Sequence, residues 1–386
     1  MSQTLQLNTE RAEREKEMHK VIDLFAGCGG LSLGFKQAGF SITSAVEFDA
    51  QAAQTYSANF PEVTLHADDI KDIDRHNTLS NEHPDVIIGG PPCQGFSMAG
   101  ARIRHGFTDD PRNYLFKHYL EIVNKLQPKV FVMENVRGLL SMRGGLVFRE
   151  IFNAFADLKL AGGESYKLDW KIVNAMDFGI PQARERLIIV GATIADFSLE
   201  YLWNKARLSL CETEPDFFTR VNVRQAISNL PEPTTDGRVT LVQPNSKYSK
   251  YLQGASTTTS NHRASRHSAT AIRRMKQVAP GENYLALDER ISSIHSGSYG
   301  RLVWDEPAST ITTRFDTPAG GRFTHPIFDR TLTAREAARI QSFPDSFSFS
   351  GNNRSISRQI GNAVPPKLAR FLAEVTKHAL TDKLQQ

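Results

Sequence analysis

Short apolar runs, bounded by glycine, proline or charged residues, recur through the first half of the chain. Their length and β-branched composition predict buried strands, at residues 20–25, 42–46, 86–88, 130–133 and 187–191. Amphipathic stretches between them predict helices, with the clearest at residues 31–39 and 115–126. Alternating buried strands and helices favour an α/β fold with a parallel sheet, in which ligands bind at the carboxyl ends of the strands.

The pattern changes after residue 193, where Pro, Ser, Thr and Gly replace the regular units. Two helical signals return near the end. A capping-box pattern at Thr333–Glu336 opens a helix through Gln341, and an amphipathic helix at 367–380 needs a sheet to pack on. We therefore expect an N-terminal extension (1–19), a Rossmann-like domain built from both ends of the chain (20–200 plus 350–386) and a smaller, irregular, mostly-β domain (201–349).

A glycine turn at residues 26–30 joins the first strand to the first helix, as at the start of a nucleotide-binding βαβ unit. Glu47 ends the second strand, where an acid would hold ribose hydroxyls, and Asp69 offers a carboxylate to an adenine amino group. Ser32 replaces the third glycine of the dinucleotide motif, so nothing here requires a pyrophosphate. An adenosine cofactor without phosphates, such as S-adenosylmethionine, fits better than NAD. The competing interpretation is a tight strand–helix corner alone.

A stiff turn, residues 89–97, presents Cys93 at the carboxyl end of the strand 86–88. Pro91 and Pro92 fix the backbone and remove two donors. Glu134 follows the strand 130–133 in the same way, so the two side chains are expected to share one crevice. The alternatives are a buried structural cysteine and a solvent-facing strand end.

Two further groups of basic residues stand out. Arg184 and Arg186 are two apart, so in an extended chain they point the same way and suit a phosphate or a carbonyl oxygen. The alternative is an exposed ion-pair rung with Glu185. Residues 261–276 hold several arginines and no acid, directly after a run of hydroxyl side chains. Such groups contact nucleic-acid backbones, although a basic run also occurs as a solvated face.

Composition adds limits. The 386 residues carry 46 Lys and Arg against 42 Asp and Glu, a net charge of +4 that permits a nucleic-acid partner without demanding one. The cysteines Cys28, Cys93 and Cys211 lack paired spacing, which argues against disulfides or a zinc site and fits a reducing cytosol. The histidines lack metal-ligand spacing, so no metal is expected. There is no apolar run long enough to span a membrane and no signal-peptide pattern.

Six motifs now agree in order: residues 23–30, 90–97, 134–136, 182–186, 335–344 and 359–365. Together they closely resemble the DNA cytosine-5 methyltransferase family, in particular the bacterial restriction-modification enzymes. The resemblance covers most of the chain outside residues 1–19 and 200–325. The uncovered middle is where such enzymes keep their target-recognition region, and Thr310-Ile311 looks like the family's Thr-plus-aliphatic pair.

The resemblance implies S-adenosylmethionine as cofactor, double-stranded DNA as partner and a cognate restriction endonuclease acting on the same site, in the bacterial cytosol. We expect a monomer. Cys93 would be the nucleophile, Glu134 would contact the base, and Arg186 with Arg184 would support the base and backbone. The cofactor site would comprise Phe25, Gly27, Gly29, Glu47, Phe48, Asp69, Ile70, Pro92, Leu115, Asn362 and Val364. DNA contacts are expected from Gln94, Ser97, Arg263, Arg266, Thr310, Ile311 and Arg314.

The chemistry explains these residue types. C5 of cytosine is a poor nucleophile until a thiolate adds to C6, and an acid at N3 favours that addition. The base must also leave the duplex to be reached. One alternative is a tRNA cytosine-5 methyltransferase, disfavoured by Gly95-Phe96 after the Pro-Pro-Cys-Gln motif and by the length of the recognition region. Another is a catalytically silent DNA-binding relative, which the presence of both Cys93 and Glu134 opposes.

Overall fold

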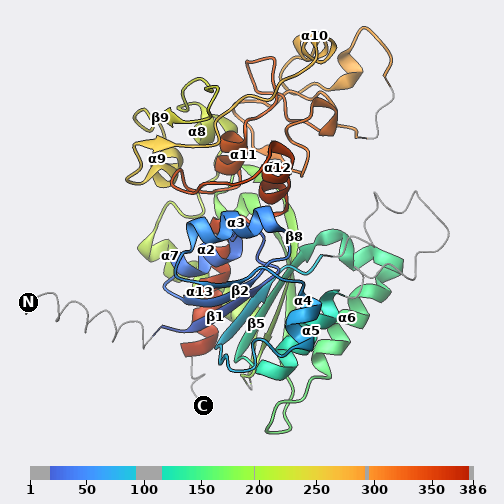
Figure 1. The fold of residues 1–386 in the computed structure, drawn as a ribbon, viewed down its shortest axis with the longest axis vertical. Helices are drawn as coiled ribbons and strands as arrows, with labels where there is room; N and C mark the ends of the chain where they lie inside the picture. The colour runs from blue at the N-terminus through green and yellow to red at the C-terminus, as the bar shows by residue number, and fades with distance from the viewer. Residues whose placement is uncertain (1–17, 93–114, 195, 292–294, 382–386) are drawn as a thin grey trace, which may run out of the picture.

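A seven-stranded sheet forms the lower half of the molecule (Figure 1), in the order β3-β2-β1-β4-β5-β8-β6. The computed structural model describes residues 18–92, 115–194, 196–291 and 295–381. The strands are β1 (Lys20–Leu24), β2 (Ser41–Val46), β3 (Thr64–His66), β4 (Val86–Gly89), β5 (Val130–Val136), β6 (Lys167–Asn174) and β8 (Glu185–Ala192). The first five are parallel, whereas β8 runs antiparallel to β5 and β6. The expected α/β class is confirmed.

Successive strand residues enter two different cores, because side chains alternate across a sheet. In β4, Val86 and Ile88 belong to one core and Ile87 to the other. Helices cover both faces (Figure 1). One face carries α2 (Gly30–Gln37), α7 (Leu199–Thr213) and α13 (Pro366–Thr381), and the other carries α4 (Ile70–Arg75), α5 (Leu115–Leu126) and α6 (Leu146–Ala156). Burial on both faces explains why the strands read as continuous apolar runs.

The C-terminal helix α13 packs against α2 and α7, so the two ends of the chain meet on one face of the sheet. Helix α7 begins at Leu199 and continues well past residue 200, where the sequence led us to expect a domain change. Its buried residues Leu202, Ala206 and Leu210 recur every four positions, a helical pattern that the change in composition obscured. The large unit therefore extends beyond the expected boundary.

The upper part of the molecule is irregular (Figure 1). Its helices are α8 (Val223–Ile227), α9 (Lys247–Gln253), α10 (Ala269–Gln277) and α11 (Ala334–Ile340), and its strands β9 (Val239–Thr240), β10 (Thr258–Thr259) and β11 (Ala308–Ser309) have two residues each. Strand β11 pairs with β7 (Gln182–Ala183). The expectation of mostly β structure is corrected here, because helices supply most of the regular residues.

Side chains take over the role of strand ladders in this region. The guanidinium of Arg301 is buried and donates to the carbonyls of Val278, Met275 and His325 at 2.6–2.9 Å. A buried cation that binds several carbonyls holds extended segments together without a sheet. The Ser- and Thr-rich composition predicted extended backbone, but it did not show which groups form hydrogen bonds with that backbone.

The remaining helices join the two parts. Helix α3 (Ala50–Asn59) packs against α12 (Asn353–Asn362). The predicted capping box is present at α11, where Thr333 Oγ1 accepts from the Glu336 amide and Glu336 accepts from the Thr333 amide. Four 3₁₀ segments complete the described chain: η3 (Arg137–Gly145), η4 (Ala175–Phe178), η5 (Tyr284–Ala286) and η6 (Pro318–Gly320). Among the helices described, we find none with the length and apolarity to cross a membrane.

Candidate active site

A cavity of about 560 Å³ opens at the carboxyl ends of β1, β2, β4 and β5. Residues from the end of the chain close one side, because α12 and the segment after it also line the cavity. The expected cofactor residues found in its wall are Phe25, Gly27, Glu47, Phe48, Asp69, Ile70, Pro92, Leu115, Asn362 and Val364. Glu134 and Arg186 line the same cavity. Parallel strands thus bring distant motifs to one edge of the sheet.

Glu47 is held rigidly at the end of β2. Its Oε2 accepts from the Gly27 amide at 2.8 Å and its Oε1 accepts from the Asp49 amide at 2.7 Å. Burial raises the pKa of this carboxyl, while the two amide hydrogen bonds act in the opposite direction. The glycine turn and the acid therefore form one unit that fixes where each acid oxygen lies.

The turn after β1 carries backbone strain at the cavity wall. Phe25 has φ +60°, a left-handed conformation that is uncommon for a bulky residue. The next amide, of Ala26, donates to the carbonyl of Val46 at 3.0 Å and holds the turn against β2. Phe48 is 73% exposed and leaves an aromatic surface free at the cavity edge. Gly29 does not line the cavity and instead caps α2.

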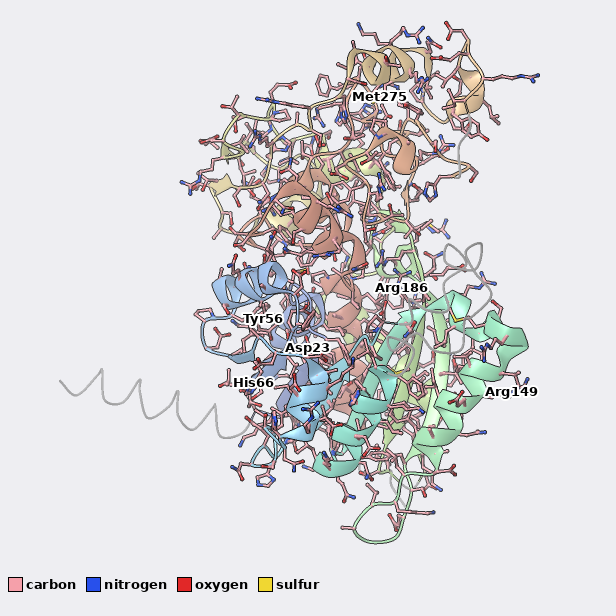
Figure 2. All side chains as sticks on the ribbon, turned by 45° about the vertical axis from the view of Figure 1, so that its right-hand side comes forward. Asp23, Tyr56, His66, Arg149, Arg186 and Met275 are labelled. Carbon is pink, nitrogen blue, oxygen red and sulfur yellow. The ribbon has the colours of Figure 1, made fainter. Side chains whose placement is uncertain are left out.

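Glu134 and Arg186 form an ion pair at the upper end of the sheet, where Figure 2 labels Arg186. Arg186 Nε lies 2.7 Å from Glu134 Oε1, and both side chains are largely buried. Glu134 lies in β5 and Arg186 in β8. These strands are neighbours and antiparallel, and their register brings the two side chains close together. A Cβ on Gly90 would lie 3.2 Å from Glu134 Oε2. A glycine at that place lets the turn after β4 approach the carboxyl closely.

Asn135 ties that same turn to β5. Its Nδ2 donates to the Pro91 carbonyl at 3.0 Å, and Pro92 follows on the cavity wall. Cys93, Gln94 and Ser97 lie outside the described residues. Asn135 lies within the 134–136 motif, but the spacing of that motif does not predict this contact.

Arg184 takes a different position from the one expected. Its side chain is fully buried and donates to the carbonyls of Ile311, Gly361 and Ala363 at 3.0–3.1 Å. It does not line the cavity, whereas Arg186 does. The alternation rule applies within one continuous strand, and Arg184 falls between β7 and β8. The two arginines therefore do not form a parallel pair.

The expected DNA-contact residues are also divided. Arg263, Arg266 and Arg314 are exposed. Thr310 Oγ1 donates to the Ala183 carbonyl at 2.6 Å. Ile311 is fully buried, and its amide donates to Gln182 Oε1 at 2.8 Å. Ile311 therefore packs in the interior of the protein and does not face solvent.

A link between α3 and α12 was not foreseen. Arg358 forms an ion pair with Asp49, and both residues line the cavity. Neither residue belongs to one of the six motifs. Arg358 directly precedes the motif at residues 359–365, and this position is the feature of the sequence that could have indicated a role for it. Within the part of the chain that the structure describes, no group of three or more His, Cys, Asp or Glu residues is placed to hold a metal ion.

A cavity at the carboxyl ends of parallel strands, with a buried carboxylate–arginine pair in its wall, is typical of an α/β protein that binds a small ligand at this edge of its sheet. The family model described as C-5 cytosine-specific DNA methylase matches residues 19–378, and the chain belongs to this family. The expectation of an enzyme of this family is thereby confirmed.

Named relatives agree with this assignment. The chain is 37% identical to the Type II methyltransferase M.DdeI of Desulfomicrobium norvegicum, over 92% of this chain and 87% of that protein. It is 36% identical to the Type II methyltransferase M1.HphI of Haemophilus parahaemolyticus, over 92% of this chain and 85% of that protein.

Solved structures share the fold. A crystal structure described as a DNA modification methyltransferase encoded within an E. coli prophage superposes with a TM-score of 0.73 at 28% identity. That match covers 94% of this chain and 100% of the other. The Dnmt2 methyltransferase of S. pombe gives a TM-score of 0.59 at 17% identity, covering 95% of this chain and 100% of that one. The second similarity shows the fold alone.

Proposed function

We propose that this chain transfers the methyl group of S-adenosylmethionine to C5 of a cytosine that is flipped out of a specific double-stranded DNA sequence. The observation that carries the proposal is the shared cavity. It combines a cofactor-type wall with the Glu134–Arg186 pair, directly beside the turn that leads to Cys93. The Type II names of the relatives further support a role in protecting DNA of the bacterial cytosol from a cognate restriction endonuclease.

The cavity fits the proposed cofactor on four counts. Its volume is in the range of small-molecule sites. The fixed Glu47 carboxylate suits ribose hydroxyls, and the exposed Phe48 ring offers a stacking surface for adenine. Asp69 lies in the wall, and its carboxylate would accept from an adenine amino group. When bound, S-adenosylmethionine supplies an electrophilic methyl group.

The chain's own residues would activate the cytosine. The Cys93 sulfur adds to C6, which breaks the aromaticity of the ring and makes C5 nucleophilic. Glu134 contacts N3 and the amino group of the base, and Arg186 holds that carboxyl in place. After the methyl group is gained, C5 loses its proton and C6 releases the sulfur, so that the ring becomes aromatic again.

Duplex DNA is the proposed substrate because the target atom must be reached and recognised. Flipping a base costs a few kcal/mol, which contacts to the DNA backbone must offset. The exposed arginines of the upper part supply such contacts. Target selection would come from side chains of residues 201–349 that reach base edges in the major groove.

Bisulfite sequencing of DNA from cells that express the chain tests the reaction and its target together. We expect one short sequence to be methylated at cytosine, and no methylation with Cys93→Ala, which should still bind DNA and cofactor. Full activity of that variant would contradict the assigned nucleophile. Tritium release from tRNA but not from duplex DNA would instead favour the tRNA enzyme.

A second test addresses the covalent step. Duplexes that contain 5-fluorocytosine in the target are expected to trap a stable adduct with the wild-type chain, because fluorine cannot leave C5 as a proton does. The adduct is measured as a shift on a denaturing gel. A chain that methylates cytosine but forms no adduct would rule out addition at C6.

A further inference from the structure

An ion pair lies at the wall of the cavity where α3 and α12 meet. Arg358 of α12 donates to Asp49, which stands directly before α3, and the two helices pack against each other (Figure 1). Both residues line the cavity, and so does Glu47, the acid that the proposed function assigns to the ribose hydroxyls. The chemical steps proposed above make no use of Arg358.

The ion pair is not what joins the two helices. Thr55 of α3 donates from Oγ1 to Gln359 Oε1 at 2.7 Å, and the Asn352 amide donates to Gln51 Oε1 at 3.0 Å. The two side chains of the ion pair are 54% and 34% exposed, the arginine being the more exposed. Exposed ion pairs contribute little to stability, because water already solvates both charges. A purely structural role therefore does not account for the pair.

Asp49 affects Glu47 directly. The Asp49 amide donates to Glu47 Oε1 at 2.7 Å, so the two carboxylates are neighbours, and like charges disfavour each other. Burial raises the pKa of Glu47, and the hydrogen bonds from the Asp49 and Gly27 amides lower it. The charge of Asp49 then acts to raise this pKa, and the charge of Arg358 acts to lower it. Without Arg358, the repulsion from Asp49 would be unopposed by its ion-pair partner.

Acids predominate among the charged groups around Glu47. The titratable groups near it, or in the same cavity wall, are Asp23 in β1, Cys28 in the turn after β1, Asp68, Asp69 and Lys71 around the start of α4, Asp49 before α3 and Arg358 in α12. Arg186 also lines the cavity, but its guanidinium is paired with Glu134. Arg358 is therefore the cation placed to offset Asp49.

We propose that Arg358 is a positioning residue for the cofactor, which offsets the charge of Asp49 and thereby keeps the Glu47 carboxylate ionised to accept hydrogen bonds from the ribose hydroxyls. The inference rests on the proposed function, because that function supplies the ribose. An ionised carboxylate is a stronger acceptor than a neutral acid, and each oxygen of Glu47 accepts from a backbone amide. A proton on Glu47 weakens these hydrogen bonds together with the contacts to the ribose.

The affinity for S-adenosylhomocysteine at two pH values tests this role. Arg358→Gln keeps a polar side chain but removes the charge, so the Glu47 carboxyl should gain its proton at a higher pH. Relative to the wild type, the dissociation constant should rise by up to about tenfold at pH 6 and by at most about twofold at pH 8. Calorimetric titration of the full chain measures this ratio. Asp23, whose pKa of about 7 lies in the same range, is present in both proteins, so its effect cancels in the ratio.

A double variant separates charge balance from a structural link. Asp49→Asn keeps the cap of α3, since asparagine also caps helices well, but it removes the charge that Arg358 offsets. In Arg358→Gln/Asp49→Asn, the affinity at pH 6 should return to within about twofold of the wild-type value. In a Glu47→Gln background, Arg358→Gln should have no further effect. Arg224→Gln is the matched control, because Arg224 also forms an exposed pair, with Asp305, but does not line the cavity.

Three results would overturn the inference: unchanged affinity in Arg358→Gln, an equal loss at pH 6 and pH 8, or a double variant as weak as Arg358→Gln. The last two are the results expected of a mechanical strap between α3 and α12. Failure of the proposed function is distinguishable, since the wild type would then bind no S-adenosylhomocysteine. In that case carbon-13 NMR of the glutamate carboxyls, assigned with Glu47→Gln, still measures the pKa of Glu47, and a pKa that Arg358→Gln leaves unchanged would overturn the inference.

Discussion

Glu134 is the residue whose chemistry depends most directly on its neighbours. Its Oε1 lies against Arg186, and its Oε2 lies beside Gly90 of the turn that leads to Cys93. The ion pair fixes the carboxyl at the end of β5, and the missing side chain of Gly90 leaves the space. One oxygen is therefore engaged with the protein while the other faces the crevice wall.

We predict that Glu134→Gln keeps the shape of the site but loses the acid–base function and the ion pair. The rate of methyl transfer should fall by roughly 10²- to 10⁴-fold, while cofactor and duplex binding change little. Single-turnover methyl transfer measures the effect. Glu185→Gln is the matched control. Glu185 directly precedes Arg186 in β8 and also pairs with an arginine, Arg137, but that pair is exposed. Normal turnover by Glu134→Gln would remove Glu134 from the mechanism.

Asp23 is a buried acid within the sheet. It is fully buried in β1, where Ser32 Oγ donates to its Oδ2 at 2.6 Å and in turn lies 2.7 Å from the Tyr56 hydroxyl. Burial raises the pKa of Asp23 to about 7. The folded chain therefore holds this proton at pH values where the unfolded chain, with a pKa of about 3.9, has released it.

The consequence is a pH-dependent cost. The stabilising effect of the bound proton is fully present below about pH 4 and is lost as the pH rises through about 7. Asp23→Asn cannot ionise, so it should raise the free energy of unfolding at pH 8, by up to about 4 kcal/mol, and much less at pH 5. Urea unfolding at both pH values measures this. An equal effect at pH 5 and pH 8 would show that Asp23 does not titrate between them.

Asp85→Asn provides a control of opposite sign. Burial acts to raise the pKa of Asp85, but hydrogen bonds from Lys129 and the Lys20 amide outweigh it and lower the pKa. Its contribution is present above the unfolded pKa and is lost as the pH falls through the folded one. Asp85→Asn should therefore destabilise the chain at pH 8 and have less effect in acid.

Among the elements, the contact between α2 and α13 is the closest link between the two ends of the chain. A Cβ at Gly34 of α2 would lie 2.4 Å from both the Ala369 Cβ and the Arg370 amide nitrogen of α13. Backbone cannot move away as the end of a flexible side chain can. The helices approach this closely only because residue 34 is glycine.

We predict that Gly34→Ala destabilises the chain by about 1–3 kcal/mol, although alanine favours an isolated helix by about 1 kcal/mol. The loss arises from overpacking and is measured by urea unfolding. Gly162→Ala is the control, because no heavy atom lies within 4 Å of a Cβ at that position. If Gly34→Ala were as stable as the wild type, α13 would have room to shift and the proposed constraint would be absent.

Elements with a local signal were predicted well from the sequence. The strands with two buried faces appeared as apolar runs, and the capping box predicted at Thr333 and Glu336 is present at the start of α11. Strand β6 was not predicted, because it lies at the edge of the sheet and mixes Lys167, Asp169 and Trp170 instead of forming an apolar run. Edge strands with one exposed side lose the continuous pattern.

The candidate site divides in the same way. Glu47, Asp69 and Glu134 were predicted to lie close together and do line one cavity, because each stands at or just after the carboxyl end of a parallel strand. The positions of Arg184 and Ile311 were not predicted, because each is set by partners more than a hundred residues away in the chain. Sequence spacing carries no information on such contacts.

At the scale of the whole molecule, three distant segments meet at Arg184. Its guanidinium binds the carbonyl of Ile311, in the middle region, and those of Gly361 and Ala363, next to the cavity-wall residues Asn362 and Val364. Gln182 adds to the junction, since its amide group binds both Ile311 and Gln341. The middle region and the wall of the cavity are therefore joined through a buried polar centre.

This junction predicts a loss of cofactor affinity from a residue that does not line the cavity. Arg184→Lys keeps the charge. A single ammonium group, however, cannot replace the two guanidinium nitrogens that together bind three carbonyls. We expect it to destabilise the chain by roughly 3 kcal/mol and, at temperatures where the variant is still folded, to raise the dissociation constant of S-adenosylhomocysteine about tenfold. Calorimetric titration measures the second effect, and the exposed Arg137→Lys should show neither. Lower stability with unchanged cofactor affinity would show that the carbonyls of Gly361 and Ala363 keep Asn362 and Val364 in place without Arg184.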